Sequence, residues 1–196
     1  MPTRVLLIRH ADVENPRKLL YGHLPGFVLS AKGRRQAEEL GRRLAPEGIP
    51  LIAHSPLDRA RETAEIIAAQ MDPPPVLEPR PELREAEFSR YLQGVPYWQI
   101  PLVRPLWFVH KARRGWLDGD EPVGEMARRV LDVADDLAQR FPDQTTALIS
   151  HADPLQAAWV VLDGRAETDR ELTRKPVARA GMLTVEYRDG ARALVS

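Results

Sequence analysis

The stretch Val5-Leu6-Leu7-Ile8-Arg9-His10 joins an unbroken apolar run to an arginine and a histidine. The run does not alternate with polar residues, which is typical of a strand buried on both faces of a largely parallel sheet. Two similar runs are Leu51-Ile52-Ala53 and Ala147-Leu148-Ile149, and they are followed by His54 and His151. Because ligands of open α/β sheets bind beyond the carboxyl ends of the strands, the three histidines are candidates for one site.

The helices are predicted from where proline is missing. The chain has 18 prolines, but four segments contain none and are predicted helices: 31–44, 57–71, 123–141 and 155–172. Ser30 is suited to cap the first of them. Strands alternating with helices predict the α/β class, here a three-layer α/β/α sandwich with a mainly parallel central sheet.

The last part of the chain and one internal segment depart from this alternation. Leu183–Tyr187 and Ala193–Val195 flank Asp189-Gly190 and predict a closing hairpin. Residues 88–122 hold 7 of the 12 aromatic residues and several prolines, and are predicted to form a helical, aromatic-rich insertion. No repeat or low-complexity tract is visible, so residues 1–196 are expected to form a single domain.

Composition excludes several classes of protein. The 28 Lys and Arg residues balance the 28 Asp and Glu residues, which disfavours a dedicated nucleic-acid binder. The longest uncharged stretch, 91–103, is too short for a membrane span, which needs roughly 20 apolar residues. The N-terminus lacks the layout of a secretory signal, and without cysteine there is neither a disulfide framework nor thiolate chemistry. A cytoplasmic protein is expected, and the scarcity of Asn and Cys is compatible with a thermophilic source.

Five blocks in order along residues 4–152 resemble signatures of the histidine phosphatase superfamily, the phosphoglycerate-mutase-like fold. In that family the blocks read Arg-His-Gly, Leu-Thr-x-x-Gly-x-x-Gln-Ala, Ser-Pro-Leu-x-Arg-Ala-x-x-Thr-Ala, Leu-x-Glu and Ser-His-Gly. Here they read Arg9-His10-Ala11, Leu29–Ala37, Ser55–Ala64, Leu83-Arg84-Glu85 and Ser150-His151-Ala152. Five ordered blocks form a specific signal, whereas a single Arg-His pair carries none.

The resemblance implies a role for each matching residue. His10 is the expected nucleophile, forming a phosphohistidine that divides one difficult displacement into two easier ones. Arg9 and Arg59 are expected to stabilise the charge of the transferring phosphoryl group. His151 is expected to hydrogen-bond an equatorial oxygen, and Glu85 to act as general acid and then general base. No metal or other cofactor is required, because the arginines neutralise the phosphate.

Four further residues are expected to bind substrate: Asn15 as a neutral donor, the pair Tyr21-Gly22, and the amide of Ala152. Two of these depart from the family pattern. Many relatives have their asparagine one position later, and Tyr21 stands where they often have glutamine. The Trp-x-Asp that follows in true mutases is absent after Gly22, so phosphatase chemistry is favoured over mutase chemistry.

Other candidates have simpler explanations. Taken alone, Arg61 is a solvated helix residue and His54 a structural residue at a strand end. His23 lies in a loop that could reach the site. In the insertion, the aromatic residues are expected to act as a lid on an apolar leaving group, unless they form ordinary core or a dimer interface. The basic residues expected there to attract further anionic groups are Arg104, His110, Lys111, Arg113 and Arg114.

Three functions therefore stay open: a metal-independent phosphomonoesterase, a phosphoglycerate-mutase-type phosphotransferase, and a non-catalytic phosphate-binding or interaction module. The expected partner is a small phosphorylated substrate rather than nucleic acid or membrane. The aromatic segment makes a homodimer plausible.

Overall fold

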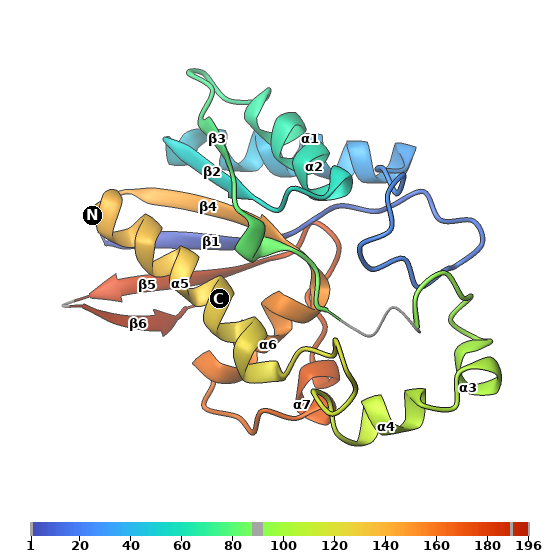
Figure 1. Ribbon diagram of the computed structural model, residues 1–196. Coiled ribbons are helices and arrows are strands. Elements are labelled where there is room, and N and C mark those ends of the chain that lie inside the picture. Colours follow the sequence, from blue (N-terminus) through green and yellow to red (C-terminus); the bar gives the residue numbers. More distant parts are fainter. Residues whose placement is uncertain (1, 88–91, 189, 196) are drawn as a thin grey trace.

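A six-stranded sheet forms the centre of the molecule, with strand order β3-β2-β4-β1-β5-β6 (Figure 1). The computed structural model describes residues 2–87, 92–188 and 190–195. The first four strands of this order run parallel to one another, and the hairpin β5–β6 completes the sheet in antiparallel fashion. The strands are β1 (Thr3–Arg9), β2 (Leu51–His54), β3 (Val76–Pro79), β4 (Thr145–Ser150), β5 (Met182–Arg188) and β6 (Ala191–Leu194).

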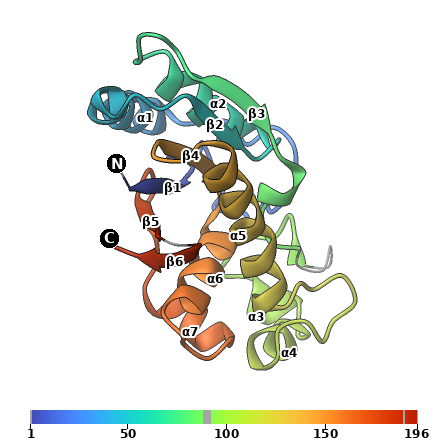
Figure 2. The same ribbon diagram turned by 90° about the vertical axis from the view of Figure 1, so that its left-hand side faces the viewer.

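Helices cover both faces of the sheet. The pair α1 (Ala31–Leu44) and α2 (Asp58–Ala68) lies on one face, and α5 (Val123–Arg140) and α6 (Ala152–Leu162) lie on the other (Figure 2). Side chains alternate across β1, so that Leu6 and Ile8 join the core under α1 and α2, while Val5 and Leu7 join the core under α5 and α6. This arrangement explains the unalternated apolar runs and confirms the predicted α/β sandwich.

The start of α1 is fixed against the loop that follows β1. Ser30 caps the helix by accepting a hydrogen bond from the Gly33 amide (3.0 Å) and donates one to the Asp12 carboxylate (2.8 Å). A Cβ atom at Gly33 would lie 2.0 Å from the Asp12 carbonyl oxygen, so this close approach requires glycine. The predicted cap is confirmed.

Two predicted boundaries were wrong. The segment 155–172 is not one helix, because α6 begins earlier, at Ala152, and ends at Leu162, before Gly164 turns the chain with a φ of +64°. A separate short helix, α7 (Asp169–Arg174), follows. The helix predicted over 57–71 spans only α2. The short edge strand β3 was not predicted, because its half-exposed sequence Val-Leu-Glu-Pro lacks a buried apolar run. The closing hairpin is confirmed, apart from Asp189, which lies outside the described residues.

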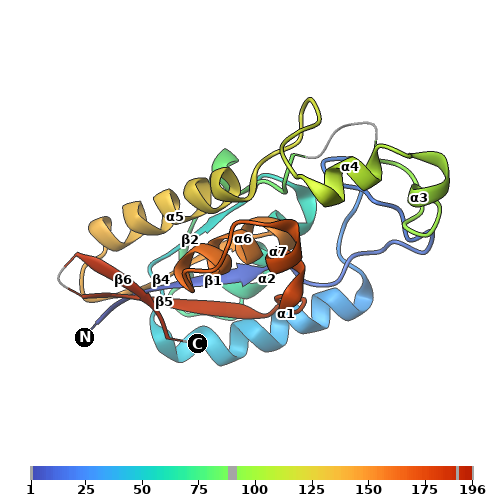
Figure 3. The same ribbon diagram turned by 90° about the horizontal axis from the view of Figure 1, so that it is seen from below.

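Two short helices, α3 (Ile100–Val103) and α4 (Trp107–Ala112), lie beyond the carboxyl ends of β1 and β4 and outside the three layers (Figure 3). Three aromatic side chains here are mostly exposed: Trp98 (69%), Phe108 (57%) and Trp116 (64%). Residues 88–91 of the predicted insertion lie outside the described residues. Among the helices that the structure describes, none has the length and apolar character needed to cross a bilayer.

Candidate active site

His10 follows the end of β1 and is buried (1% exposed). Its backbone amide donates to the Ser150 carbonyl of the neighbouring strand (2.9 Å), and its Nδ1 lies 2.8 Å from the Ala11 carbonyl oxygen. A carbonyl only accepts, so Nδ1 carries the proton and Nε2 keeps its lone pair. Burial, followed by the charges of Arg59 and Arg179, lowers the pKa of His10 well below its ordinary value. The imidazole is therefore neutral near pH 7 and suited to nucleophilic attack.

His151 faces His10 from the end of β4, with ring centroids 5.0 Å apart. Its Nε2 lies 2.8 Å from the Ser55 hydroxyl oxygen, which also accepts a hydrogen bond from the Leu57 amide (3.3 Å). The Ser55 proton is thus available to donate to Nε2, and the proton of His151 then resides on Nδ1. Burial and the charge of Arg59 lower the pKa of His151. A neutral imidazole with Nδ1 as donor can hydrogen-bond a phosphoryl oxygen.

Two arginines bring positive charge to this pair of histidines. Arg59, in the first turn of α2, is 1% exposed; its Nη2 donates to the Gly22 carbonyl (2.8 Å), and its guanidinium carbon lies 4.8 Å from the centre of the Tyr21 ring. Arg9, at the end of β1, donates from Nη1 to the Val177 carbonyl (2.6 Å). Within the described chain neither forms a salt bridge, and the Nε atoms of both are buried without a hydrogen-bond partner. Their charge and donors remain available to an anion.

Thr63 connects α2 to the chain that follows β1. Its hydroxyl donates to the Arg59 carbonyl (2.7 Å) and accepts from the Ala11 amide (3.2 Å). One buried side chain thus sets the position of α2 relative to the residue after His10.

Glu85 follows a 3₁₀ turn (Pro81–Leu83), and one of its carboxylate oxygens lies 4.0 Å from Nδ1 of His151. Burial and the nearby Asp153 carboxylate raise the pKa of Glu85, as a general acid requires. Its backbone is tied down on both sides. The Leu83 carbonyl accepts from the Ser150 hydroxyl (2.8 Å), and the carbonyls of Arg84 and Glu85 are hydrogen-bonded by Arg129 (2.7 Å) and His23 (2.7 Å).

A cavity of about 240 Å³ adjoins this site. Of the predicted catalytic and substrate-binding residues, Arg9, His10, Tyr21, Glu85 and Ala152 line it, whereas the buried Arg59 and His151 are not among its lining residues. An apolar wall continues the cavity away from His10 and is formed by Leu20, Leu92, Ile100 and Trp107.

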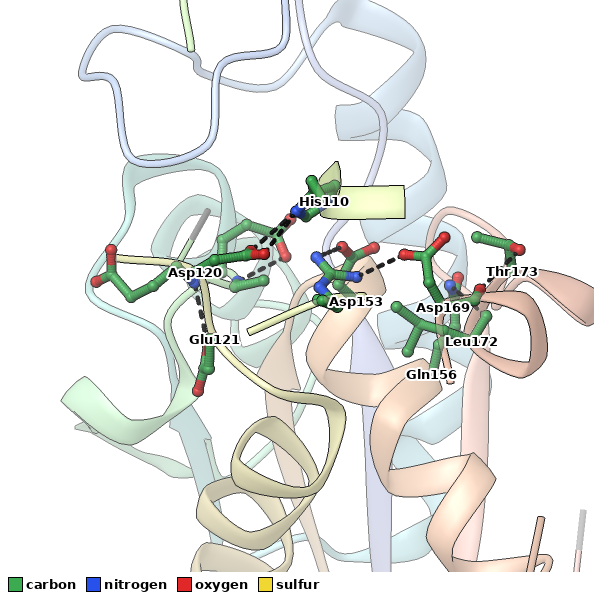
Figure 4. Close-up of polar contacts among 12 residues, drawn as sticks. His110, Asp120, Glu121, Asp153, Gln156, Asp169, Leu172 and Thr173 are labelled. Atoms are coloured by element: carbon green, nitrogen blue, oxygen red, sulfur yellow. Dashed lines mark hydrogen bonds and ion pairs between the residues drawn. The ribbon is translucent and has the colours of Figure 1, made fainter. Parts of the chain in front are cut away.

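The far end of the cavity carries charges that neutralise one another. Lys111 lies in α4, and Arg114 lies just after it. Both pair with Asp169 (2.9 and 3.3 Å), and Arg114 also pairs with Asp153 (2.6 Å). Although burial alone would raise the pKa of Asp153, its pairing with Arg114 lowers it. His110 is buried and bonded through Nδ1 to both oxygens of Asp120 (2.9 Å each), close to the ion pairs around Asp153 and Asp169 (Figure 4).

Several predicted residues are placed differently. The Asn15 amide bonds the backbone of Leu19 through both its nitrogen (2.9 Å) and its oxygen (3.0 Å), and so closes its own loop. Gly22 contributes its carbonyl to Arg59 rather than lining the cavity. Two others lie as expected: His54 is buried at a strand end and bonded to the Ser55 carbonyl (3.0 Å), and Arg61 pairs on the surface with Asp58 and Glu65.

The expectation that the basic residues of α4 and its flanks attract anions was wrong for three of them, because His110, Lys111 and Arg114 are engaged by aspartates. Arg113 stacks on Trp116 at 4.2 Å.

Sequence reasoning did not single out three residues of this site. Ser55 is the first residue of a matched block and Asp153 directly follows another, so their positions in the sequence offered a signal. Arg179, which lines the cavity, offered none, because it is one of many arginines and lies far from every block.

Comparison with known proteins places this geometry in a family. The fold matches Bacillus stearothermophilus YhfR (TM-score 0.85, 22% identity, 97% of this chain and 94% of that one). It also matches mycobacterial glucosyl-3-phosphoglycerate phosphatase Rv2419c (TM-score 0.82, 21% identity, 99% and 97%).

In sequence, the uncharacterised protein Rv0525 of Mycobacterium tuberculosis is 33% identical over 195 residues (97% of this chain, 92% of the relative). Phosphoserine phosphatase 1 of Hydrogenobacter thermophilus is 28% identical over 166 residues (82% and 76%). Other relatives are named as phosphoglycerate mutases, and together they support an enzyme of phosphatase or mutase type. The model of histidine phosphatase superfamily branch 1 matches residues 5–196, and the chain belongs to that superfamily.

Proposed function

We propose that the protein is a metal-independent phosphomonoesterase that hydrolyses a small phosphate ester through a phosphohistidine at His10. The observation that carries this proposal is a buried imidazole whose Nδ1 faces a carbonyl oxygen, which leaves Nε2 unprotonated, set beside arginines that form no salt bridge in the described chain. Such a site attracts a phosphate and offers it a nucleophile.

In the first half-reaction, Nε2 of His10 attacks phosphorus, and the bond from phosphorus to the ester oxygen breaks. Glu85, kept protonated by its raised pKa, gives its proton to the departing oxygen. Arg9 and Arg59 stabilise the equatorial oxygens of the transferring group, and Nδ1 of His151 donates to one of them. Cationic side chains thereby supply the charge stabilisation that a metal gives in other phosphatases.

In the second half-reaction, a water molecule attacks phosphorus while the bond between phosphorus and Nε2 breaks. The Glu85 carboxylate takes the proton of this water and returns to its acid form. Inorganic phosphate leaves, and His10 regains its neutral state with the proton still on Nδ1. Each group ends the cycle as it began.

A mutase is the second candidate, because relatives carry that name. A mutase must also hold the carboxylate of its substrate and the second phosphate that its bisphosphorylated intermediate carries. The cations at the far end of this cavity, Lys111 and Arg114, are already paired with Asp153 and Asp169, which favours hydrolysis. Product analysis with 3-phosphoglycerate separates the two: hydrolysis releases inorganic phosphate, and a mutase forms an isomer.

The experiment that tests the proposal is turnover of p-nitrophenyl phosphate, phosphoserine and a panel of sugar phosphates in excess EDTA. We expect release of inorganic phosphate at an unchanged rate with and without the chelator. Loss of activity in EDTA and its recovery with a divalent cation would contradict metal independence. No turnover of any ester, together with binding of orthophosphate, would support a non-catalytic phosphate-binding module.

A further inference from the structure

Arg179 has no role in the mechanism above, yet it lines the same cavity as His10. It lies in the loop between α7 and β5 and is half-buried. Its Nη1 donates a long hydrogen bond to the Tyr21 hydroxyl (3.4 Å). In the part of the chain that the structure describes, no carboxylate forms a salt bridge with it. Arg179 thus brings a third uncompensated positive charge to the cavity.

The backbone beside Arg179 is fixed to the backbone of the nucleophile. The Arg9 amide donates to the Gly181 carbonyl (2.9 Å), and the Ala180 amide donates to the His10 carbonyl (3.4 Å). Ala180 has a φ of +53°, a conformation that a residue with a side chain rarely adopts. Such strain persists where the surroundings enforce it, and it concentrates at ligand sites. The loop that carries Arg179 is therefore held in register with His10.

The charge of Arg179 also acts on the groups that perform the chemistry. It lowers the pKa of His10, and its contribution is smaller than those of burial and Arg59 and larger than that of Arg9. Arg179 also lowers the pKa of Arg9, and among the causes of that shift only burial is larger. By contrast, Lys111 and Arg114 of the same cavity are neutralised by aspartates. Among the described basic residues that line the cavity beyond the family motifs, Arg179 is the one whose charge remains available.

We infer that Arg179 is a third phosphate-binding arginine, which donates to the oxygens of the phosphoryl group and is held in place by the Tyr21 hydroxyl. Tyr21 is a positioning residue in this arrangement: its ring stacks on Phe27 (4.6 Å between centroids) and lies under Arg59, while its hydroxyl reaches Arg179. This assigns a function to the tyrosine that replaces the glutamine common in relatives. The inference rests on the proposed function for the identity of the ligand.

The direct test measures orthophosphate binding by calorimetry and kcat/KM with p-nitrophenyl phosphate for Arg179→Met. The matched control is Arg170→Met, which removes one positive charge from the exposed surface of α7. A hydrogen bond between charged groups is worth roughly tenfold to a hundredfold in binding, so Arg179→Met should weaken orthophosphate binding by that factor and lower kcat/KM at least as much. Arg170→Met should change neither quantity.

A second variant tests the role of Tyr21. Tyr21→Phe keeps the ring against Phe27 and Arg59 but removes the hydroxyl, and it should weaken orthophosphate binding about threefold to tenfold. The same substitution made in Arg179→Met should have no further effect on binding, because the hydroxyl acts through Arg179. Equal losses in both backgrounds would show that Tyr21 acts independently and would contradict its positioning role.

Orthophosphate separates this inference from the proposed function, since its binding needs no turnover. If Arg179→Met bound orthophosphate as tightly as the parent protein, Arg179 would not contact the phosphoryl group, whatever the catalytic result; unchanged orthophosphate affinity with a raised KM would indicate a contact to the leaving group instead. If orthophosphate binding weakened in Arg179→Met but no phosphoenzyme formed in the parent protein, the role of Arg179 in phosphate binding would be supported and the phosphohistidine mechanism would be contradicted.

Discussion

The two ends of the cavity hold similar side chains in opposite electrostatic states. At the His10 end, Arg9 and Arg59 bind only carbonyl oxygens, and their charges remain uncompensated within the described chain. At the α4 end, Lys111 and Arg114 are matched by aspartates. A buried charge without a partner is costly to the fold unless a ligand supplies the counter-charge. Under the proposed function, the phosphate would bind at the first end and an uncharged part of the leaving group at the second.

The largest expected effect is that of His10→Gln, which removes the nucleophile. We expect kcat with p-nitrophenyl phosphate to fall by roughly 10⁴-fold or more, because no other group in the site replaces Nε2. His54→Gln is a matched control, since His54 is also buried at a strand end with Nδ1 on the next carbonyl. If His10→Gln retained substantial activity and His54→Gln were affected to the same extent, His10 would not be the nucleophile. The comparison between the two ends of the cavity would then lose its basis.

The next largest effect is expected at Arg59, which forms no salt bridge within the described chain. Arg59→Met should lower kcat/KM by about 10²- to 10³-fold, while Arg59→Lys should recover part of this loss by restoring charge without the planar fork. Arg61→Met, on the same helix but paired on the surface with Asp58 and Glu65, should have little effect. Steady-state kinetics with thermal melting of each variant checks this, and equal losses at both positions would contradict it.

Glu85 gives a prediction about pH. Its pKa is raised by burial and by Asp153, so it stays protonated above the ordinary range of a glutamate, and kcat/KM should fall as the pH rises through that raised pKa. At low pH, activity should fall only where His10 gains a proton, below the ordinary range of histidine, because its pKa is lowered. The pH profile of kcat/KM with an alkyl phosphate measures both limits, because it reports the groups of the free protein.

Replacement of Glu85 by glutamine removes the acid and should abolish the fall at higher pH. We expect kcat to drop by about 10²- to 10⁴-fold with an alkyl phosphate and much less with p-nitrophenyl phosphate, whose leaving group needs no proton. Glu82→Gln, an exposed neighbour in the preceding turn, is the control. A profile in Glu85→Gln identical to that of the parent would assign the acid to another group.

The smallest expected effect is at the paired end. Asp169→Asn frees Lys111 and one nitrogen of Arg114, so KM for an ester with an additional carboxylate, such as 3-phosphoglycerate, should fall about threefold to tenfold. KM for p-nitrophenyl phosphate should not change. Glu171→Gln, on the same helix but paired with Arg165 and Arg174, should leave both values unchanged. If the Asp169 variant behaved like this control, pairing would not govern which leaving groups are accepted.

Local patterns in the sequence were sufficient for every strand of the sheet except β3 and for the residues nearest His10. Unbroken apolar runs indicate strands buried on both faces, and the residues that end them, such as Arg9 and His151, necessarily lie at one edge of a parallel sheet. The position of Glu85 came from the family motif and not from its own properties, since neighbouring glutamates look the same in the sequence.

What could not be predicted depends on contacts between distant segments. Lys111 and Asp169 are 58 residues apart, and no pattern in one sequence indicates that they neutralise each other. Arg179 and Tyr21 are 158 residues apart, so a surface arginine and a phosphate-binding one look identical until the loop is placed beside His10. The break between α6 and α7 was missed for a different, local reason: the segment has no proline, and Gly164 within it was not taken as the point where the chain turns.

The central claim is most directly tested by trapping the intermediate. The protein is mixed with a ³²P-labelled phosphate ester, quenched within milliseconds, and the phosphoprotein is tested for stability in acid and in base. The account predicts a phosphoenzyme that is acid-labile and base-stable, maps to His10 and is absent from His10→Gln. Full turnover without any such species, or label on a different residue, would contradict it.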